Sequence, residues 1–253
     1  MISVVTATYN CIDTVDDCLA SVHAQMGVDV DHVIIDGASS DGTREMLEGH
    51  RKDFGAFVSE RDGGIYDALN KGITLSGGDV VGFLHADDLF ADTQVLAHVQ
   101  AAFADPSVQG VYGDLCYVSK EDTSKLVRYW RAGEYTPARL SRGWMPPHPT
   151  LYVRKEWYER IGSFNTDYRI AADYDFILRL FSHPEFKAAY IPEVLVTMRV
   201  GGASNRSLRN VIRKSREDYQ ALRASGVGGL GTLAWKNLSK LRQFLPRRGG
   251  LPR

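Results

Sequence analysis

The sequence is poor in cysteine and has no long apolar run. Its 253 residues include only three cysteines, Cys11, Cys18 and Cys116, with no C-x-x-C spacing. This pattern is typical of free thiols in a reducing compartment and argues against a disulfide framework or a cysteine zinc site. No stretch approaches the roughly 18 apolar residues of a membrane-spanning helix, and no basic segment precedes the first apolar run, as a signal peptide would require. We therefore expect a cytoplasmic protein, attached at most to the inner face of the cell membrane.

Several common catalytic and phosphate-binding motifs are also missing. The chain contains no P-loop, no G-x-S-x-G and no H-E-x-x-H. The segment 226–231, GVGGLG, fits G-x-G-x-x-G by its letters. A dinucleotide-binding loop would follow a strand and precede an acidic residue about 20 positions later, and neither is present here. We interpret this segment as a hinge between two helices.

The net charge of −1 conceals a basic C-terminal segment. From residue 206 to residue 253 the chain carries 12 Lys and Arg against only Glu217 and Asp218. Beside its basic residues Lys236, Lys240 and Arg242, apolar residues recur at helical spacing: Leu233, Trp235, Leu238, Leu241, Phe244 and Leu245. A basic amphipathic helix binds an anionic membrane surface, whereas packing on the core or in a dimer is the alternative. No known nucleic-acid motif is present, so no nucleic-acid partner is expected.

The first half of the chain alternates short apolar strands with helices. Buried strands are predicted at 2–7, 30–35, 56–59 and 80–84, and helices follow at 12–25, up to 47, at 67–75 and at 92–103. This order predicts an α/β fold with a mixed, mostly parallel sheet covered by helices. The second half has strand patterns at 110–118, 188–191 and 194–200 but no independent core. We expect one domain over 1–205, with a nucleotide-sugar lobe to about residue 113 and an acceptor lobe over 114–205, followed by a helical tail over 206–253.

Polar and acidic residues follow each of the four predicted parallel strands. Ligands of such sheets bind at the carboxyl ends of the strands. These ends carry Thr8-Tyr9-Asn10, Asp36, Glu60-Arg61-Asp62 and His85-Ala86-Asp87-Asp88. The clustering predicts a ligand site at this edge.

Asp87 and Asp88 are candidate metal ligands. One or two carboxylates suit Mg²⁺ or Mn²⁺, which keep waters and bind substrate phosphates. The alternative is that Asp88 only caps the following helix. Asp36 could accept a hydrogen bond from a base or a ribose hydroxyl, or it could cap a helix as an ordinary loop aspartate.

Three residues of the second half are also candidates. Asp173 begins a helical pattern and is either an N-cap or a general base facing an acceptor. His148 lies between prolines and could contact an acceptor hydroxyl or a phosphate, or be structural. Arg199 precedes Gly201-Gly202 and could pair with a diphosphate, or lie on the surface at a turn.

Taken in order, several segments resemble the inverting glycosyltransferases of family 2, which have the GT-A fold. The resemblance covers roughly residues 2–204, and its closest subgroup builds colanic acid, O-antigen and other bacterial surface polysaccharides or glycolipids. The matching segments are SVVTATYN, VIIDGASSDGT, SERDGGIYDALNKGI, GFLHADD, HPTLYVRKEWYERIGSFN, AADYDFILRL and RVGGASN.

The resemblance implies a role for each candidate. Asp173 would be the catalytic base, Asp87 and Asp88 would correspond to the metal-binding D-x-D region, and His148 and Arg199 would lie near the acceptor and the diphosphate. The nucleotide would be held by Thr8, Tyr9, Asp36, Asp62, Lys71 and Asp87. One departure concerns the first position of D-x-D, which is His85 here, and this affects the expected metal affinity.

The implied reaction is a single displacement with inversion. Asp173 would take the proton of an acceptor hydroxyl, and that oxygen would attack the anomeric carbon opposite the nucleotide. The expected partners are a nucleotide-sugar donor, UDP above other nucleotides, a saccharide or lipid-linked acceptor, and Mn²⁺ or Mg²⁺. Two alternatives remain: a nucleotidyltransferase, against which stands the absence of a Gly-rich first loop, and an inactive sugar-nucleotide or lipid-binding protein.

Overall fold

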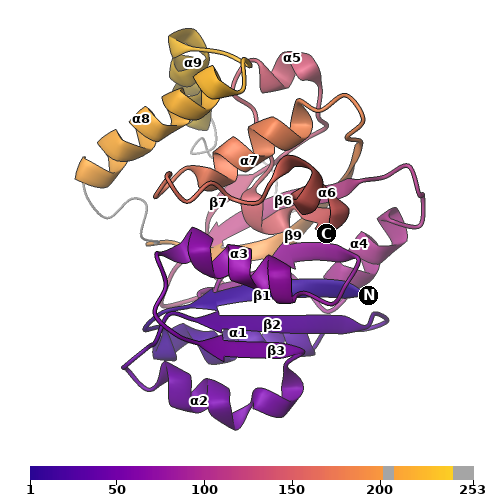
Figure 1. Ribbon diagram of the computed structural model, residues 1–253, viewed down its shortest axis with the longest axis vertical. Coiled ribbons are helices and arrows are strands. Elements are labelled where there is room, and N and C mark those ends of the chain that lie inside the picture. Colours follow the sequence, from indigo (N-terminus) through magenta and orange to yellow (C-terminus); the bar gives the residue numbers. More distant parts are fainter. Residues whose placement is uncertain (202–207, 242–253) are drawn as a thin grey trace.

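The computed structural model describes residues 1–201 and 208–241. Within these residues it forms a nine-stranded mixed sheet with helices on both faces (Figure 1). The strand order is β3-β2-β1-β4-β8-β6-β9-β5, and β7 pairs with β6 outside this path. The predicted α/β class with a mixed, mostly parallel sheet is therefore confirmed.

The N-terminal half supplies a parallel sheet of apolar strands. Its pairs β2–β1, β1–β4 and β2–β3 are all parallel. Their residues are mostly apolar and largely buried because helices cover both faces of the sheet. The strands are β1 (Ile2–Thr8), β2 (Val30–Asp36), β3 (Ala56–Ser59) and β4 (Val80–Phe83).

The second half extends the sheet with both antiparallel and parallel strand pairs. β8 joins β4 to β6 by antiparallel pairing, and β9 lies parallel to β6 and antiparallel to β5. These strands are β5 (Asp88–Phe90), β6 (Gly110–Val118), β7 (Leu126–Trp130), β8 (Tyr152–Arg154) and β9 (Ala188–Arg199). The two strands predicted at 188–191 and 194–200 are one strand, which passes Pro192 and Glu193 at a register shift against β6. A proline, which has no N–H, is tolerated at such an irregularity.

The helices divide between the two faces of the sheet. Successive residues of a strand point to opposite faces, so Val5, Val33 and Ile35 share a core with α3, α6 and α7. Val4 packs with α1 and α4, and Ile34 with α1 and α2, on the other face. The helices are α1 (Ile12–His23), α2 (Thr43–Gly49), α3 (Ile65–Leu75), α4 (Val95–Ala102), α5 (Pro137–Leu140), α6 (Glu156–Ile161) and α7 (Ala172–Phe181). Short 3-10 turns lie at Arg51–Asp53 and His148–Thr150.

The described part of the basic tail is helical and packs on the domain. α8 (Leu208–Ala224) lies against α7, and α9 (Leu230–Leu241) follows after a turn with Gly226 at a φ of 69° (Figure 1). Ala221 and Leu222 are buried in the core that contains α7, while Trp235 and Leu238 are exposed. The predicted boundary at residue 205 and the predicted apolar positions Phe244 and Leu245 lie outside the described residues. Among the described helices, none combines the length and apolar character needed to cross a membrane.

Candidate functional site

The loops that follow β1 and β2 are tied together around Asp36. Its carboxylate is fully buried and accepts hydrogen bonds from Thr8 Oγ1 at 3.0 Å and from Ser59 Oγ at 2.6 Å. It also accepts from the backbone N–H of Ser39 at 3.0 Å and from Ser39 Oγ at 2.5 Å. Burial raises the pKa of Asp36, but these hydrogen bonds outweigh burial and hold the pKa below its usual value. Asp36 is therefore an ionised group that shapes the loop after β2.

Two residues of these loops have left-handed backbone conformations. Asn10 has a φ of 48° and Ala38 a φ of 61°. The Asn10 N–H donates to Ser39 Oγ, and its side-chain oxygen accepts from the Ser40 N–H, each at 2.9 Å. A non-glycine residue with positive φ is uncommon and is held by its surroundings. The reciprocal bonds hold both loops at the sheet edge.

Tyr9 and Asp62 lie on either side of Gly37. A Cβ atom at Gly37 would come within 2.9 Å of Asp62 Oδ2 and 3.2 Å of the Tyr9 ring, so a side chain there would displace one of them. The Tyr9 ring is 67% exposed, which leaves it free to stack on a planar ligand. The Asp62 carboxylate accepts from the Gly64 N–H at 2.9 Å, next to the start of α3. Thr8, Tyr9, Asp36 and Asp62 are thus brought together at one edge.

Lys71 lies on α3 and is engaged by acidic neighbours. Its Nζ is 2.9 Å from Glu60 Oε1 and 3.4 Å from Asp67 Oδ2. The hydrogen bond to Glu60, opposed by desolvation, raises the pKa of Lys71.

Asp87 and Asp88 follow β4, as predicted, but Asp88 does not cap a helix. It begins the short strand β5, pairs with Met198 of β9, and is fully buried. Among the described residues, neither of its carboxylate oxygens has a hydrogen-bond partner. Burial and the charge of Asp87 raise the pKa of Asp88 well above its usual range, against the opposing effect of Arg199.

An unpartnered buried carboxylate beside a second carboxylate suits a divalent cation. Mg²⁺ and Mn²⁺ take one or two carboxylates and complete their coordination with water and substrate phosphates. Asp87 and Asp88 fit this requirement. The described residues include no cluster of three or more His, Cys, Asp or Glu able to hold a metal by themselves, so the phosphates of a substrate would have to complete the site.

Arg199 lies beside this pair but is committed to protein groups. Its guanidinium donates to the Asp87 carbonyl at 3.2 Å and pairs with Asp17 of α1 at 2.5 Å. Only 6% of Arg199 is exposed. It therefore fixes the segment that carries Asp87.

His148 is a buried residue close to His85. The two ring centroids are 6.1 Å apart, and His148 also contacts the rings of Phe83 and Phe164 at 5.3 and 5.5 Å. Neither ring nitrogen of His148, nor Nδ1 of His85, has a hydrogen-bond partner within the described chain. Burial lowers the pKa of His148 to about 4, although the charge of Asp173 opposes this effect. His148 is thus a neutral imidazole at neutral pH.

Asp173 lies in the first turn of α7 and does not cap it, because the N-cap residue is Ala171. The Tyr66 hydroxyl is 3.2 Å from Asp173 Oδ1 and 2.8 Å from the Ile170 carbonyl, and it can donate to one of them at a time. Burial raises the pKa of Asp173. The charges of His148, Lys214 and Lys236 and the Tyr174 N–H outweigh burial and lower it. A pKa below its usual value leaves the Asp173 carboxylate ionised at neutral pH.

Several residues that build this site were not predicted from the sequence. Tyr66 joins α3 to Asp173, and Asn70 exchanges two hydrogen bonds with the backbone of Phe164, at 2.9 and 3.0 Å. Ser39 and Ser59 bind Asp36. Each of these residues lies in or next to a segment of the family resemblance, but the partners of Tyr66 and Asn70 are about a hundred positions away.

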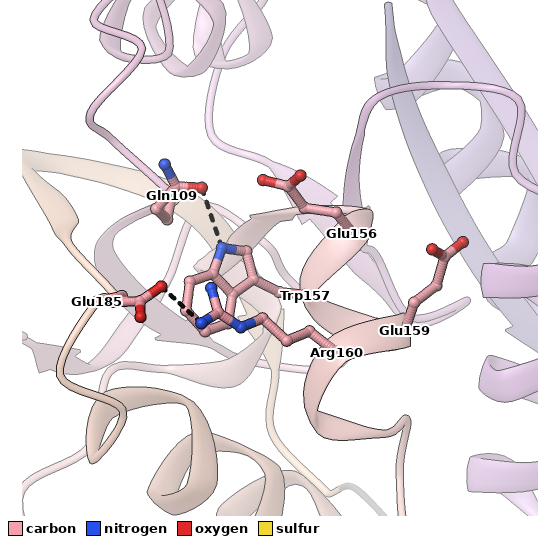
Figure 2. A pocket seen from close by; sticks show the side chains of 6 residues that line it. All are labelled: Gln109, Glu156, Trp157, Glu159, Arg160 and Glu185. Atoms are coloured by element: carbon pink, nitrogen blue, oxygen red, sulfur yellow. Dashed lines mark hydrogen bonds and ion pairs between the residues drawn. The ribbon is translucent and has the colours of Figure 1, made fainter.

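Two surface openings are lined by residues other than Asp36, Asp88 and Asp173. One of about 500 Å³ is bounded by Arg199, by Asp13, Thr14 and Asp17 of α1, and by Lys120, Glu121 and Thr123. The other, of about 450 Å³, is shown in Figure 2. There Trp157 Nε1 donates to Gln109, and Arg160 pairs with Glu185, so these polar groups already have partners. Nothing at this second opening points to a ligand.

A family model and similar named proteins both match this chain to glycosyltransferases. The family model described as Glycosyl transferase family 2 matches residues 3–170. A Mycobacterium tuberculosis H37Rv protein named PGL/p-HBAD biosynthesis glycosyltransferase is 30% identical over 210 residues, 81% of this chain and 79% of the relative. The chondroitin synthase of Pasteurella multocida is 24% identical over 97% of this chain, which spans 26% of that enzyme.

Solved structures share the fold at lower identity. TarS 1–349 of S. aureus in complex with UDP-GlcNAc has a TM-score of 0.69 at 17% identity, and the alignment covers 89% of this chain and 65% of that one. The mannosyltransferase PcManGT of Pyrobaculum calidifontis, in complex with GDP-Man and Mn²⁺, has a TM-score of 0.66 at 21% identity. That alignment covers 99% of this chain and 76% of PcManGT. The chain thus spans just under two thirds of the TarS fragment.

Proposed function

Since the chain belongs to glycosyl transferase family 2, we propose that it transfers a sugar from a nucleotide-sugar to an acceptor hydroxyl with inversion. The acceptor is a saccharide or a lipid-linked saccharide. The observation that carries this proposal is Asp173, a partly buried carboxylate in the first turn of α7 whose pKa is held below its usual value. Its charge acts on His85, which belongs to the same strand-end loop as Asp87 and Asp88.

The donor nucleotide binds at the edge formed by Thr8, Tyr9, Asp36 and Asp62. The exposed Tyr9 ring stacks on the base, and Asp36 fixes the loop beneath it. Asp36 accepts a base N–H only when a Ser or Thr hydroxyl turns away, because its oxygens already accept four hydrogen bonds. UDP is the preferred nucleotide, and TarS was solved with UDP-GlcNAc. Lys71 lies behind this edge, where it neutralises Glu60 and Asp67.

Asp87 and Asp88 would hold Mn²⁺ or Mg²⁺ together with the donor phosphates. A bound divalent ion supplies positive charge to a departing diphosphate. Arg199 contributes by holding the Asp87 backbone, and it reaches a diphosphate only by exchanging its pairing with Asp17. PcManGT, whose structure contains Mn²⁺ with GDP-Man, supports this assignment.

Asp173 is the general base of the displacement. Its carboxylate takes the acceptor hydroxyl proton as that oxygen forms a bond to the anomeric carbon. The bond from the anomeric carbon to the nucleotide diphosphate breaks, and the diphosphate leaves with the electron pair. Neutral His148 lies next to the reacting groups, where it can hydrogen-bond an acceptor hydroxyl without adding charge. Tyr66 orients Asp173 through its hydroxyl.

The biological setting is synthesis of a bacterial surface polysaccharide or glycolipid at the inner face of the cell membrane. Relatives named for PGL/p-HBAD biosynthesis and chondroitin synthesis support this class of product. Contact with a membrane interface through exposed Trp235 and Leu238 would bring the enzyme to a lipid-linked acceptor. Lys236, predicted for the basic face of this helix, is buried against Asp218 instead.

A thermal-shift panel tests the donor assignment. UDP, dTDP, GDP and CDP are each added with and without Mn²⁺, with NAD as a control. One nucleoside diphosphate should raise the melting temperature only with Mn²⁺, with about 2.7 kcal/mol of stabilisation at a hundredfold excess over its Kd. In Asp88→Asn, which keeps the shape of the side chain, adding Mn²⁺ with the nucleotide should no longer raise the melting temperature.

A hydrolysis assay with the nucleotide-sugar, together with this panel, separates the alternatives. Slow hydrolysis of the matching donor distinguishes a transferase from a binding protein. A flat panel with folded protein would count against the donor site, and an unchanged Mn²⁺ response in Asp88→Asn would remove Asp88 from the metal site.

A further inference from the structure

The helix that carries Asp173 is held at its N-terminus by a residue from the C-terminal segment. Glu217 of α8 accepts hydrogen bonds through Oε2 from the backbone N–H groups of Ile170, at 2.8 Å, and Ala171, at 3.0 Å. Ala171 is the N-cap residue of α7 and has no side-chain cap of its own. Only 7% of Glu217 is exposed. We call this pair of bonds the Glu217 clamp.

Free N–H groups at a helix N-terminus require an acceptor, and burial without one costs free energy. An N-cap side chain usually accepts from the N–H of the second or third helical residue. Glu217, 46 residues beyond Ala171, instead accepts from the N–H of the N-cap residue itself and from the N–H of Ile170 before it. The negative charge of Glu217 also suits the positive end of the helix dipole.

A second contact from the same segment lies on the other side of Asp173. Lys236 of α9 has its Nζ 3.0 Å from the centroid of the Tyr174 ring and 2.9 Å from Asp218 Oδ2. Lys236 and Asp218 are each no more than 2% exposed. Breaking a buried ion pair by removing one partner is strongly unfavourable. Tyr174 follows Asp173 directly, so the residues before and after Asp173 are both held by α8 and α9.

From this arrangement we infer that Glu217 is a positioning residue for the reaction. The Glu217 clamp fixes the backbone of residues 170–171 and so sets where Asp173 and the Ile170 carbonyl meet Tyr66. This inference rests on the proposed role of Asp173 as the base. It assigns a mechanistic role to a segment beyond residues 3–170, which the family model matches.

Three substitutions of Glu217 separate the effect of side-chain length from the effect of negative charge. Glu217→Gln keeps an oxygen that can accept both N–H groups but removes the charge. Glu217→Asp keeps the charge but withdraws the carboxylate by one bond, and Glu217→Ala removes both. Glu159→Ala, at an exposed position on α6, is the matched control.

Transfer kinetics and amide exchange are measured for each folded variant. In Glu217→Ala and Glu217→Asp, kcat should fall by about 10- to 100-fold, the effect of misplacing a catalytic group by about 1 Å. The KM for the donor should stay within about twofold, because its predicted site lies on other elements. The Ile170 and Ala171 amides should exchange faster in these two variants, while Glu217→Gln and Glu159→Ala should behave like the wild type.

The outcomes are distinct. Unchanged exchange at Ile170 and Ala171 in Glu217→Asp would overturn the clamp, and faster exchange with wild-type kcat would overturn its positioning role. If Glu217→Ala does not fold, the comparison of Asp with Gln decides the question. A wild-type protein that transfers no sugar from any donor would refute the proposed function instead, and amide exchange would still decide the clamp.

Discussion

At Asp173, burial and neighbouring charge act in opposite directions on the pKa of the carboxyl group. Burial disfavours the charged form, but the charge of His148, the charges of Lys214 and Lys236 and the Tyr174 N–H together favour it and outweigh burial. A pKa below the usual range means that the base is ionised throughout neutral and mildly acidic pH. A general base must be deprotonated when the acceptor hydroxyl arrives, so Asp173 has the protonation state that its proposed role needs.

We predict that Asp173→Asn lowers kcat for transfer by about 10²- to 10⁴-fold, the usual contribution of general base catalysis. The amide fills the same space but cannot accept the acceptor proton. Donor affinity, measured by calorimetry, should change little because the predicted nucleotide residues lie on other loops. Asp167→Asn, at an exposed position near α7, is the control. Equal transfer rates for Asp173→Asn and the wild type would end the base assignment.

At the scale of single elements, α3 lies so close to β1 that one position has no room for a side chain. A Cβ atom at Gly72 would come within 2.2 Å of Val5 Cγ1. Val5 is fully buried in the central sheet, so it has no free space to move into. This close approach brings Tyr66 to Asp173 at the start of α7, and it brings Asn70, on the same helix as Tyr66, to the backbone of Phe164.

Gly72→Ala should therefore destabilise the protein despite the better helix propensity of alanine. Overpacking of a core costs about 1–3 kcal/mol, which exceeds the gain of up to about 1 kcal/mol from replacing glycine in a helix. Urea denaturation measures the difference. Gly49→Ala on α2 is the matched control, because nothing lies within 4 Å of its added Cβ, and it should be neutral or stabilising. If both variants unfolded at the same urea concentration, the contact would carry no cost.

The elements that were predictable are those whose own residues determine their burial. β1, β2 and β4 are rich in Val, Ile and other apolar residues, so composition identifies them as buried strands. β7, by contrast, begins with exposed Leu126 and Val127 and forms because β6 offers a free edge. β5 and β8 are three residues long, which is too short for a periodic pattern. Their positions depend on pairing with distant strands.

The same division holds for the site residues. Asp36 and Asp88 were identifiable because each follows an apolar strand of the parallel sheet. Tyr66 and Glu217 were not, since Tyr66 meets Asp173 across 107 positions and Glu217 meets Ala171 across 46. The excess of basic residues in the tail also gave no indication that its two acidic residues, Glu217 and Asp218, are buried against α7. A sequence shows the type of each residue, whereas these contacts depend on the packing of helices far apart along the chain.

At the scale of the whole molecule, two buried histidines connect stability to pH. His32 lies in β2, where its Nε2 is 3.0 Å from Thr6 Oγ1 and its Nδ1 is 3.3 Å from His23 Nε2. Burial, helped by His23, lowers the pKa of His32 to about 3, and burial lowers that of His148 to about 4. Both side chains are neutral in the folded protein at pH values where the unfolded chain already binds protons, because an unperturbed histidine has a pKa of about 6.5.

The free energy of unfolding should therefore decrease as the pH falls below about 6.5, because only the unfolded state then gains these protons. For His32 the decrease continues until its folded pKa of about 3 is reached, at about 1.4 kcal/mol per pH unit. Urea denaturation of the wild type and His32→Gln between pH 7.5 and 4.5 measures this effect. At pH 7.5 the two proteins differ only by the contacts that glutamine cannot make. At lower pH the free energy of unfolding of the wild type should fall more steeply than that of His32→Gln, and the difference in slope should be about 1.4 kcal/mol per pH unit. Parallel curves over the whole range would mean that His32 takes up its proton in the folded protein as readily as in the unfolded chain.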